Sequence, residues 1–288
     1  MDVHLTTGHV YVLTPTLEFE TAKQQATDQR LKVVAGGLGG LLSRPKPEEV
    51  DLAYSEVRFE AFWHIVCAVH YEFEHNKNFV VPVTGVEVRK VTILGQEFEV
   101  AAQPAAQPGF LQQIGIGGAA RTFSVPGVEH CLDENRQERY LEAAVGQPLQ
   151  AGPEYVKKDK TELADLSTLM SGDALVVPPQ LSALKIAKTL LATMTKQIQA
   201  DKILEESTRI ETLDLYFRPV YAFEFAWKPK NKTGVAEYDA VLGSMINGKA
   251  LHTRSDKPIS HAELFDINAD TAGSLIPTAA GNVNLIVE

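Results

Sequence analysis

Residues 56–74 of the chain read EVRFEAFWHIVCAVHYEFE, in which apolar and polar residues alternate. A period of two places every second residue on one face of an extended chain, so an apolar series at that spacing predicts a β-strand with a buried face. The strand would exceed the usual ~3–10 residues, so we expect a bend or bulge within it. The apolar series occupies all the odd-numbered positions: Val57, Phe59, Ala61, Trp63, Ile65, Cys67, Val69, Tyr71 and Phe73.

A second stretch, residues 213–227 (LDLYFRPVYAFEFAW), repeats this pattern in the same phase. An amphipathic helix is predicted before it, over Leu181–Leu204, from apolar residues that recur every three or four positions. A weaker helical pattern over Leu17–Ala26 precedes the first strand. The chain therefore predicts an α+β fold made by internal duplication, in which a helix packed on a curled antiparallel sheet occurs twice.

This duplication divides the chain into three expected parts. Residues 1–100 form the first helix-plus-sheet copy, residues 101–172 form a partly irregular linker of loops and short helices, and residues 173–288 form the second copy with a C-terminal strand. Short helices are expected at Asp133–Val145 and Thr161–Met170. Turns are expected at His75–Asn78, at Leu94–Gln96, at Lys228–Gly234 and at Asn247-Gly248.

Composition and charge narrow the classes of function. Hydrophobic residues make up 44% of the 288 residues and charged residues 22%, and no stretch has the length of a membrane span. The N-terminus has no basic segment followed by an apolar one, and the two cysteines are widely separated, so we expect a cytoplasmic protein. The net charge of −10, without clustered Lys or Arg, disfavours nucleic acid as a partner.

The histidines of the first strand offer one candidate site. His64 and His70 share the even-numbered face, but six strand residues separate them by about 20 Å, which is too far for a shared metal ion. His70 and Glu72 are neighbours on that face and can form part of a binding site with groups from another strand. Solvated polar residues on a half-buried strand are the alternative, and we expect no metal and no cofactor.

The two cysteines differ in their surroundings. Cys67 lies on the apolar face, where a thiol is a small buried hydrophobe. Cys131 follows His130 at the expected start of a helix, where an imidazole and the helix N-terminus would stabilise a thiolate, although a structural cysteine is the commoner case. A glycine run, Gly36–Gly40, would allow close approach of a ligand, but a flexible connection between helix and strand explains it better.

Two hypotheses for function remain. The first is a non-enzymatic binding or assembly module, which acts through its sheet edges and the seam between the copies on a protein partner or on itself. The opposite charges of Glu60 and Arg218 at matching positions would pair across that seam. The C-terminal strand would offer Val283, Leu285 and Val287 to a neighbour. The alternative is a small-ligand-binding protein or hydrolase-type enzyme, with a pocket between the copies built from His70, Glu72, His130 and Cys131.

Overall fold

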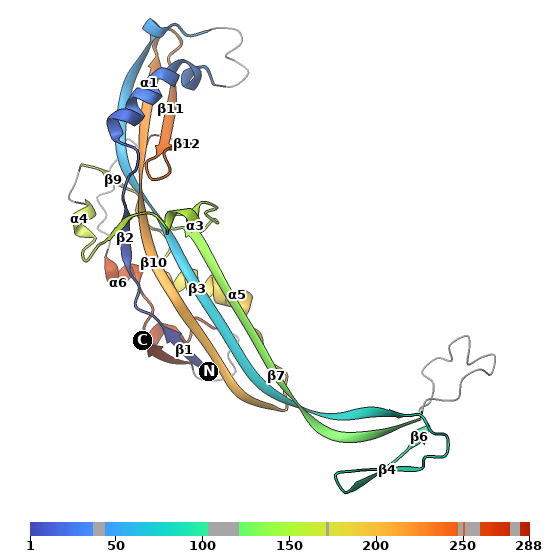
Figure 1. The fold of residues 1–288 in the computed structure, drawn as a ribbon. Coiled ribbons are helices and arrows are strands. Elements are labelled where there is room, and N and C mark those ends of the chain that lie inside the picture. The colour runs from blue at the N-terminus through green and yellow to red at the C-terminus, as the bar shows by residue number, and fades with distance from the viewer. Residues whose placement is uncertain (37–43, 103–120, 171–172, 247–249, 251–259, 277–282) are drawn as a thin grey trace, which may run out of the picture. The chain divides into compact units, whose positions relative to one another are not determined.

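The fold is mainly β and is not a duplicated α+β unit. The computed structural model describes residues 1–36, 44–102, 121–170, 173–246, 250, 260–276 and 283–288. Of these residues 50% are strand and 21% are helix, and one large mixed sheet dominates the chain (Figure 1). The predicted duplication is therefore wrong. The two aromatic-rich stretches are neighbours in one sheet, and strands that face a common core share the phase of their apolar residues.

The described elements are as follows. The strands are β1 (Asp2–Leu5), β2 (Val10–Leu13), β3 (Val50–Val83), β4 (Lys90–Ile93), β5 (Gln96–Glu99), β6 (Ala101–Ala102), β7 (Arg121–Glu142), β8 (Lys160–Glu162), β9 (Leu175–Val176), β10 (Lys202–Trp227), β11 (Lys232–Asp239), β12 (Ser244–Ile246) and β13 (Asn284–Val287). The helices are α1 (Phe19–Ala35), α3 (Gly152–Tyr155), α4 (Ser167–Met170), α5 (Ala183–Met194), α6 (His261–Leu264) and α7 (Ala269–Ala272), and single 3₁₀ turns occur at η2 (Pro47–Glu49) and η3 (Lys228–Lys230).

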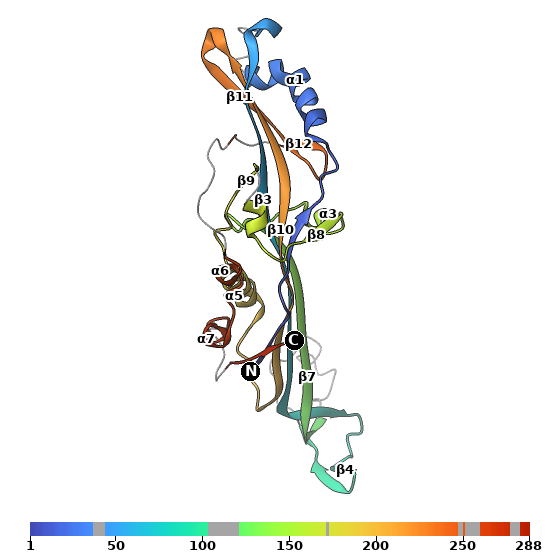
Figure 2. The same ribbon diagram turned by 90° about the vertical axis from the view of Figure 1, so that its left-hand side faces the viewer.

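The main path of the large sheet runs β12-β11-β10-β3-β7-β6. Strands β1 and β2 add to β10 in parallel, whereas β11 pairs with β10 in antiparallel fashion, so the sheet is mixed. The C-terminal strand β13 pairs in parallel with β1, and this brings the two ends of the chain side by side (Figure 2). A separate antiparallel hairpin, β4–β5, turns at Leu94 and Gly95, both of which have positive φ, and confirms the turn predicted there.

The chain forms two compact units. Unit 1 comprises Met1–Val69, Asn135–Gln197 and Ser207–Glu288, and unit 2 comprises His70–Glu134 and Ile198–Glu206. The strands β3, β7 and β10 each contribute residues to both units. Most of the buried apolar side chains belong to unit 1, whereas the strands of unit 2 are largely half-buried or exposed.

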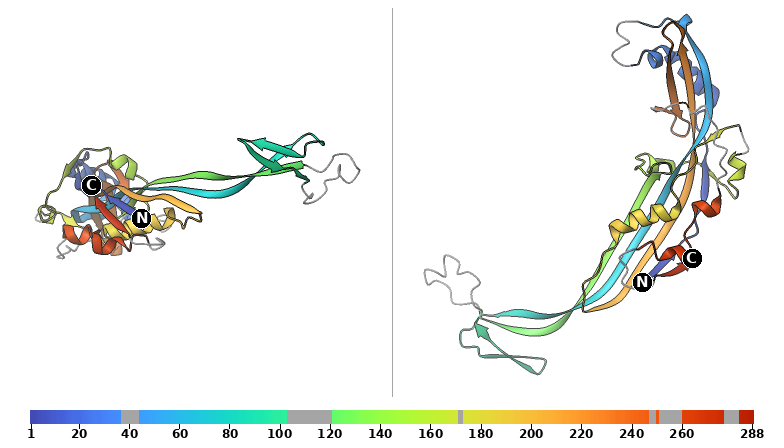
Figure 3. Two further views of the ribbon diagram at one scale, coloured as in Figure 1. Left: turned by 90° about the horizontal axis from the view of Figure 1, so that it is seen from below. Right: turned by 180° about the vertical axis from the view of Figure 1, so that it is seen from behind.

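In unit 1, consecutive residues of β3 face different layers. Phe62 stacks on Tyr216 and packs against Tyr155 of α3. The next residue, Trp63, donates its indole N–H to the Leu181 carbonyl before α5. Successive strand side chains point to opposite faces, so both faces of β3 are covered at this level. Figure 3 shows α5 lying along the strands of this unit.

The predicted helix before β10 is confirmed in part. Helix α5 buries Ala187, Leu191 and Met194, which belong to the predicted apolar series, together with Ile186 and Leu190 from outside that series. Leu184 of the series is half-buried, and Ile198 lies beyond the helix. It ends at Met194, and the last residues of the predicted range, Lys202 to Leu204, already belong to β10. The earlier helix α1 is confirmed but shifted, and its Ala22, Ala26 and Val34 pack against the aromatic side chains of β10 and β11.

Two segments, one predicted as a helix and one as a turn, lie in strands instead. The expected helix Asp133–Val145 lies mostly within β7, where exposure alternates residue by residue. The expected turn at His75–Asn78 lies inside β3, which continues without a break to Val83. In both cases pairing with the neighbouring strand overrides local preference. The glycines Gly37–Gly40 and the expected turn at Asn247-Gly248 lie outside the described residues.

Candidate functional site

The best-buried charged group in unit 1 is centred on Arg58 of β3. Its guanidinium lies 3.0 Å from the Glu56 carboxylate and 2.8 Å from that of Glu60, and it also pairs with Glu237 of β11. The side chains of Arg58, Glu56 and Glu237 are at most 4% exposed. Glu56, Arg58 and Glu60 alternate along β3 and so share one face, and the strand pattern itself brings them together.

A second guanidinium, that of Arg218 in β10, extends this group. It lies 2.7 Å from the Glu60 carboxylate and 2.9 Å from that of Asp239. It also donates to the Tyr155 hydroxyl at 2.7 Å, and that hydroxyl in turn donates to Asp239. Glu60 and Arg218 therefore meet across adjacent strands of one sheet, and not across a seam between two copies. Their role as interface residues stays a prediction.

We call these charged side chains the buried charge cluster; they are Glu56, Arg58, Glu60, Arg218, Glu237 and Asp239. Four carboxylates face two guanidinium groups, so the cluster is negative when every group is ionised. Burial raises the pKa of the Glu237 carboxyl, and the charge of Glu60 adds to the effect against the opposing charge of Arg58. Glu237 Oε2 is buried and accepts no hydrogen bond from the described residues.

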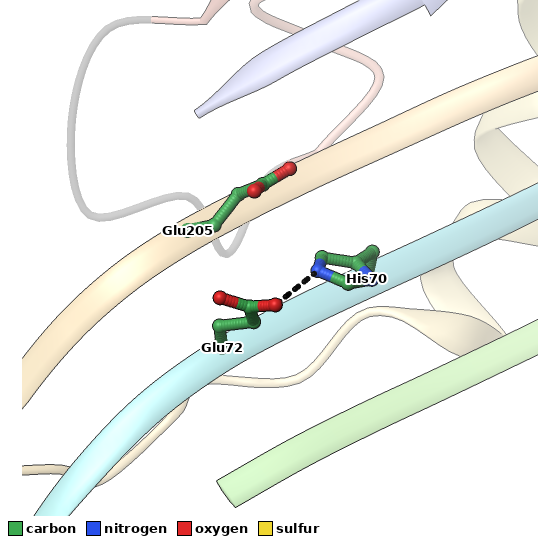
Figure 4. Close-up of side chains that lie close together, drawn as sticks. All are labelled: His70, Glu72 and Glu205. Atoms are coloured by element: carbon green, nitrogen blue, oxygen red, sulfur yellow. Dashed lines mark ion pairs between the residues drawn. The ribbon is translucent and has the colours of Figure 1, made fainter. Parts of the chain in front are cut away.

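The histidine predicted as a candidate, His70, lies in unit 2 on β3. Its Nδ1 is 3.0 Å from a carboxylate oxygen of Glu134 in β7, and its Nε2 is 3.6 Å from a carboxylate oxygen of Glu72. Figure 4 shows His70 and Glu72 together on β3, with Glu205 of β10 beside them. One ligand atom from each of His70, Glu72 and Glu205 lies within 4.8 Å of the others. We call these three residues together with Glu134 the His70 cluster.

The carboxylates around His70 favour its protonated form. The hydrogen bond that the imidazole donates to Glu134 raises the pKa of His70 above its ordinary 6.5. Burial opposes this effect, and the charges of Glu205, Glu134 and Glu72 add to it. The sequence located His70 and Glu72 because they are two residues apart. It missed Glu134 and Glu205, because one lay in a predicted helix and the other directly after a predicted helix.

The other predicted site residues do not join this cluster. His130 pairs with Glu74 at 3.3 Å, and its side chain is 73% exposed. Cys131 follows it in β7, so the two side chains point to opposite faces of the strand. Cys131 lies within a strand and not at the start of a helix, so the basis for a reactive Cys131 is removed. Burial raises the pKa of Cys67 to about 12, which keeps that thiol protonated at neutral pH.

The C-terminal residues predicted as an interface lie at the edge of the sheet. Leu285 pairs with Val3 and Val287 with Leu5, so β13 uses one of its edges within the chain. Val287 is 67% exposed, and Val283 directly precedes the strand. No helix among the described residues is long and apolar enough to cross a membrane. Comparison with protein families, curated proteins and solved structures gives no match to this chain.

Proposed function

We propose that this chain is a non-enzymatic assembly protein, in which the outer edge of β7 pairs with the same edge of a second copy. Among the described residues, β7 has a long open edge in the main sheet, and this edge carries the proposal. On one side β7 is bonded to β3. On the other, within the described part of the chain, β6 pairs with Arg121 and Thr122, and Pro148 bridges to Leu141. An open strand edge presents unpaired N–H and C=O groups and is a template for strand addition.

The direction of the backbone groups follows from the end of β7. The Tyr140 carbonyl accepts from Leu149 N–H, and Glu142 N–H donates to the Gln147 carbonyl, both outside the main sheet path. By contrast, Ala143 N–H donates to Ala61 of β3. In an antiparallel ladder the N–H and C=O of one residue point to the same side, and the side alternates along the chain. The even-numbered residues of β7 therefore direct their backbone groups outward.

A proline supports this assignment. Pro126 is even-numbered and lies within β7. Proline has no N–H, so it is tolerated in a strand where that position faces solvent and not a ladder partner. The alternation of exposure continues without a break from Phe123 to Glu138, which gives no sign of a bulge that would change the phase. Between Val128 and Glu134 the outward edge is free of proline.

The sequence of this edge is complementary to itself in one antiparallel register. A twofold axis at Leu132 sets His130 of one copy opposite Glu134 of the other, and sets Cys131 opposite Asp133. No pair of like charges is opposed anywhere between Val128 and Arg136 in this register. Such an interface is isologous, the commonest kind in soluble oligomers, and opposed unlike charges favour cross-strand pairing.

Exposed apolar side chains lie along the same segment in unit 2. Leu132 is 61% exposed and Val128 is 43% exposed, and both lie on the even-numbered face of β7. At the axis the two Leu132 side chains would contact one another. A two-stranded ribbon is marginally stable by itself in water, so added strands would also stabilise β3 and β7 in this unit.

The cysteines and the net charge of the chain bear on its compartment and on its class of partner. Both cysteines are free thiols, one of them buried, which supports a reducing compartment such as the cytoplasm. The net charge of −10 disfavours nucleic acid and leaves protein surfaces as partners. An extended segment of a different protein would use the same edge, and it is the alternative that the following experiment separates from self-association.

Sedimentation velocity of the full chain over a range of concentrations tests the proposal. We expect a monomer–dimer equilibrium in the wild-type chain, and a monomer at every concentration for Leu132→Pro, which lacks the outward N–H. The matched control is Leu132→Ala, which loses the same apolar contact but retains that N–H and so retains measurable dimer. A wild-type chain that stays monomeric at high concentration contradicts self-pairing and leaves the edge to a different partner. Equal dimerisation of the proline variant shows that the dimer uses another surface.

A further inference from the structure

We propose that the His70 cluster binds a divalent first-row transition-metal ion, Zn²⁺ in the first instance, through His70 Nε2 and one carboxylate oxygen each from Glu72 and Glu205. The three ligands come from neighbouring strands of one unit, β3 and β10. One imidazole and two carboxylates are ligand types that Zn²⁺ accepts, and a fourth, open position would hold water.

The separations of the ligand atoms fit a metal ion after a small movement of one side chain. With metal–ligand bonds of about 2.0–2.2 Å, two ligands of a tetrahedral ion lie roughly 3.4 Å apart. His70 Nε2 and Glu72 Oε1 are already 3.6 Å apart. The three atoms lie within 4.8 Å of one another, so a closer approach of the Glu205 oxygen to the other two would complete the geometry.

Glu134 is placed to orient the ring of His70 for a metal ion. Its carboxylate lies 3.0 Å from the other ring nitrogen of His70, Nδ1. Glu134 belongs to β7, which is on the opposite side of β3 from β10. When Nδ1 carries the ring proton and donates it to this carboxylate, the lone pair of Nε2 is directed toward Glu72 and Glu205. Metal-bound histidines almost always donate the other ring N–H to a carboxylate, a backbone carbonyl or water, which fixes the tautomer.

The charge of the cluster points to the same ligand. Three carboxylates, those of Glu72, Glu134 and Glu205, surround one imidazole. The combined negative charge of these carboxylates attracts a divalent cation. Among divalent ions of the first transition row, affinity for such a site rises from Mn²⁺ to Cu²⁺ and falls again at Zn²⁺.

Isothermal titration of the full chain with Zn²⁺ at neutral pH tests the site. We expect saturable binding that is weakened at least about tenfold in His70→Ala and in Glu205→Gln, and about tenfold or more in Glu134→Gln, which leaves all three ligands in place. Mn²⁺ should bind more weakly than Zn²⁺. The NMR signal of the His70 ring should shift on addition of Zn²⁺ with the same midpoint as the calorimetric titration.

The matched control is His130→Ala. His130 lies in the same unit and contacts one carboxylate, that of Glu74, whereas three carboxylates surround His70. This variant should bind Zn²⁺ as the wild-type chain does. Absence of Zn²⁺ binding overturns the proposal, and so does binding that survives in both His70→Ala and Glu205→Gln. All three ligands belong to one chain, so Leu132→Pro, which prevents dimerisation, should bind Zn²⁺ with unchanged affinity. The result of the Zn²⁺ titration therefore does not depend on dimerisation.

Discussion

Arg218 and Arg58 are the residues on which the buried charge cluster depends. Each guanidinium contacts at least two carboxylates, and Glu60 is shared between them. A buried ion pair adds little net stability over an apolar pair, but loss of one partner leaves the other charge buried without compensation. The cluster therefore affects stability most when one of its charged side chains is removed.

Arg218→Met should lower the free energy of unfolding by about 3–5 kcal/mol, because Asp239 would remain buried without a cation and Glu60 would keep only Arg58. Urea unfolding at neutral pH measures this effect. Arg209→Met is the matched control, since Arg209 lies in the same strand but is exposed. It should change stability by less than about 0.5 kcal/mol. Equal effects of the two substitutions would show that the cluster contributes no more than a surface charge.

Glu237 makes the stability of the chain depend on pH. Its pKa in the folded chain is raised above the ordinary 4.5, so the folded state holds this proton more tightly than the unfolded state. The resulting stabilisation is present below the unfolded pKa and is lost as pH rises through the folded pKa. Glu237→Gln cannot lose a proton there, so its stability relative to the wild-type chain should increase as pH rises from 4.5. Urea unfolding of both chains over pH measures the difference, and a difference that is constant or falls with pH contradicts the shift.

At the scale of elements, the sequence predicted strands better than it predicted their partners. The odd-numbered apolar residues of β3 from Trp63 to Tyr71 are buried as expected. The same alternation gave no sign that the even-numbered Glu56 and Arg58 are also buried, because the groups that cover them come from β11, far along the chain. Glu134 likewise reaches His70 from 64 residues away. Contacts of this range leave no local periodicity in a sequence.

The direction of the backbone groups in β7 is testable with a pair of proline substitutions. Leu132→Pro should lower the free energy of unfolding by less than about 1 kcal/mol, because the N–H that it removes faces outward. Pro126 already occupies a position of the same phase in β7. Cys131→Pro should be more destabilising, because its N–H faces β3 and the substitution removes a ladder hydrogen bond. Urea unfolding measures both. Equal costs, or a greater cost for Leu132→Pro, would show that the assigned directions are wrong.

At the scale of the whole molecule, the predicted duplication failed for a physical reason. Two stretches with the same apolar phase arise in repeated domains, and equally in adjacent strands that share the faces of one sheet. The pairing of Glu60 with Arg218 at 2.7 Å reflects the second case. The sequence has no signal that separates the two cases, because the distinction depends on which strands bond to each other.

Pairing of the outer edge of β7 with the same edge of a second copy would form new backbone hydrogen bonds. Residue-resolved amide hydrogen exchange at low and at high protein concentration detects these bonds themselves. The outward amides of Val128, His130, Leu132 and Glu134 should exchange freely in dilute protein and become protected as concentration rises. The odd-numbered amides between them should be equally protected at both concentrations. Unchanged exchange at the four outward amides under conditions where the chain is dimeric would contradict this pairing.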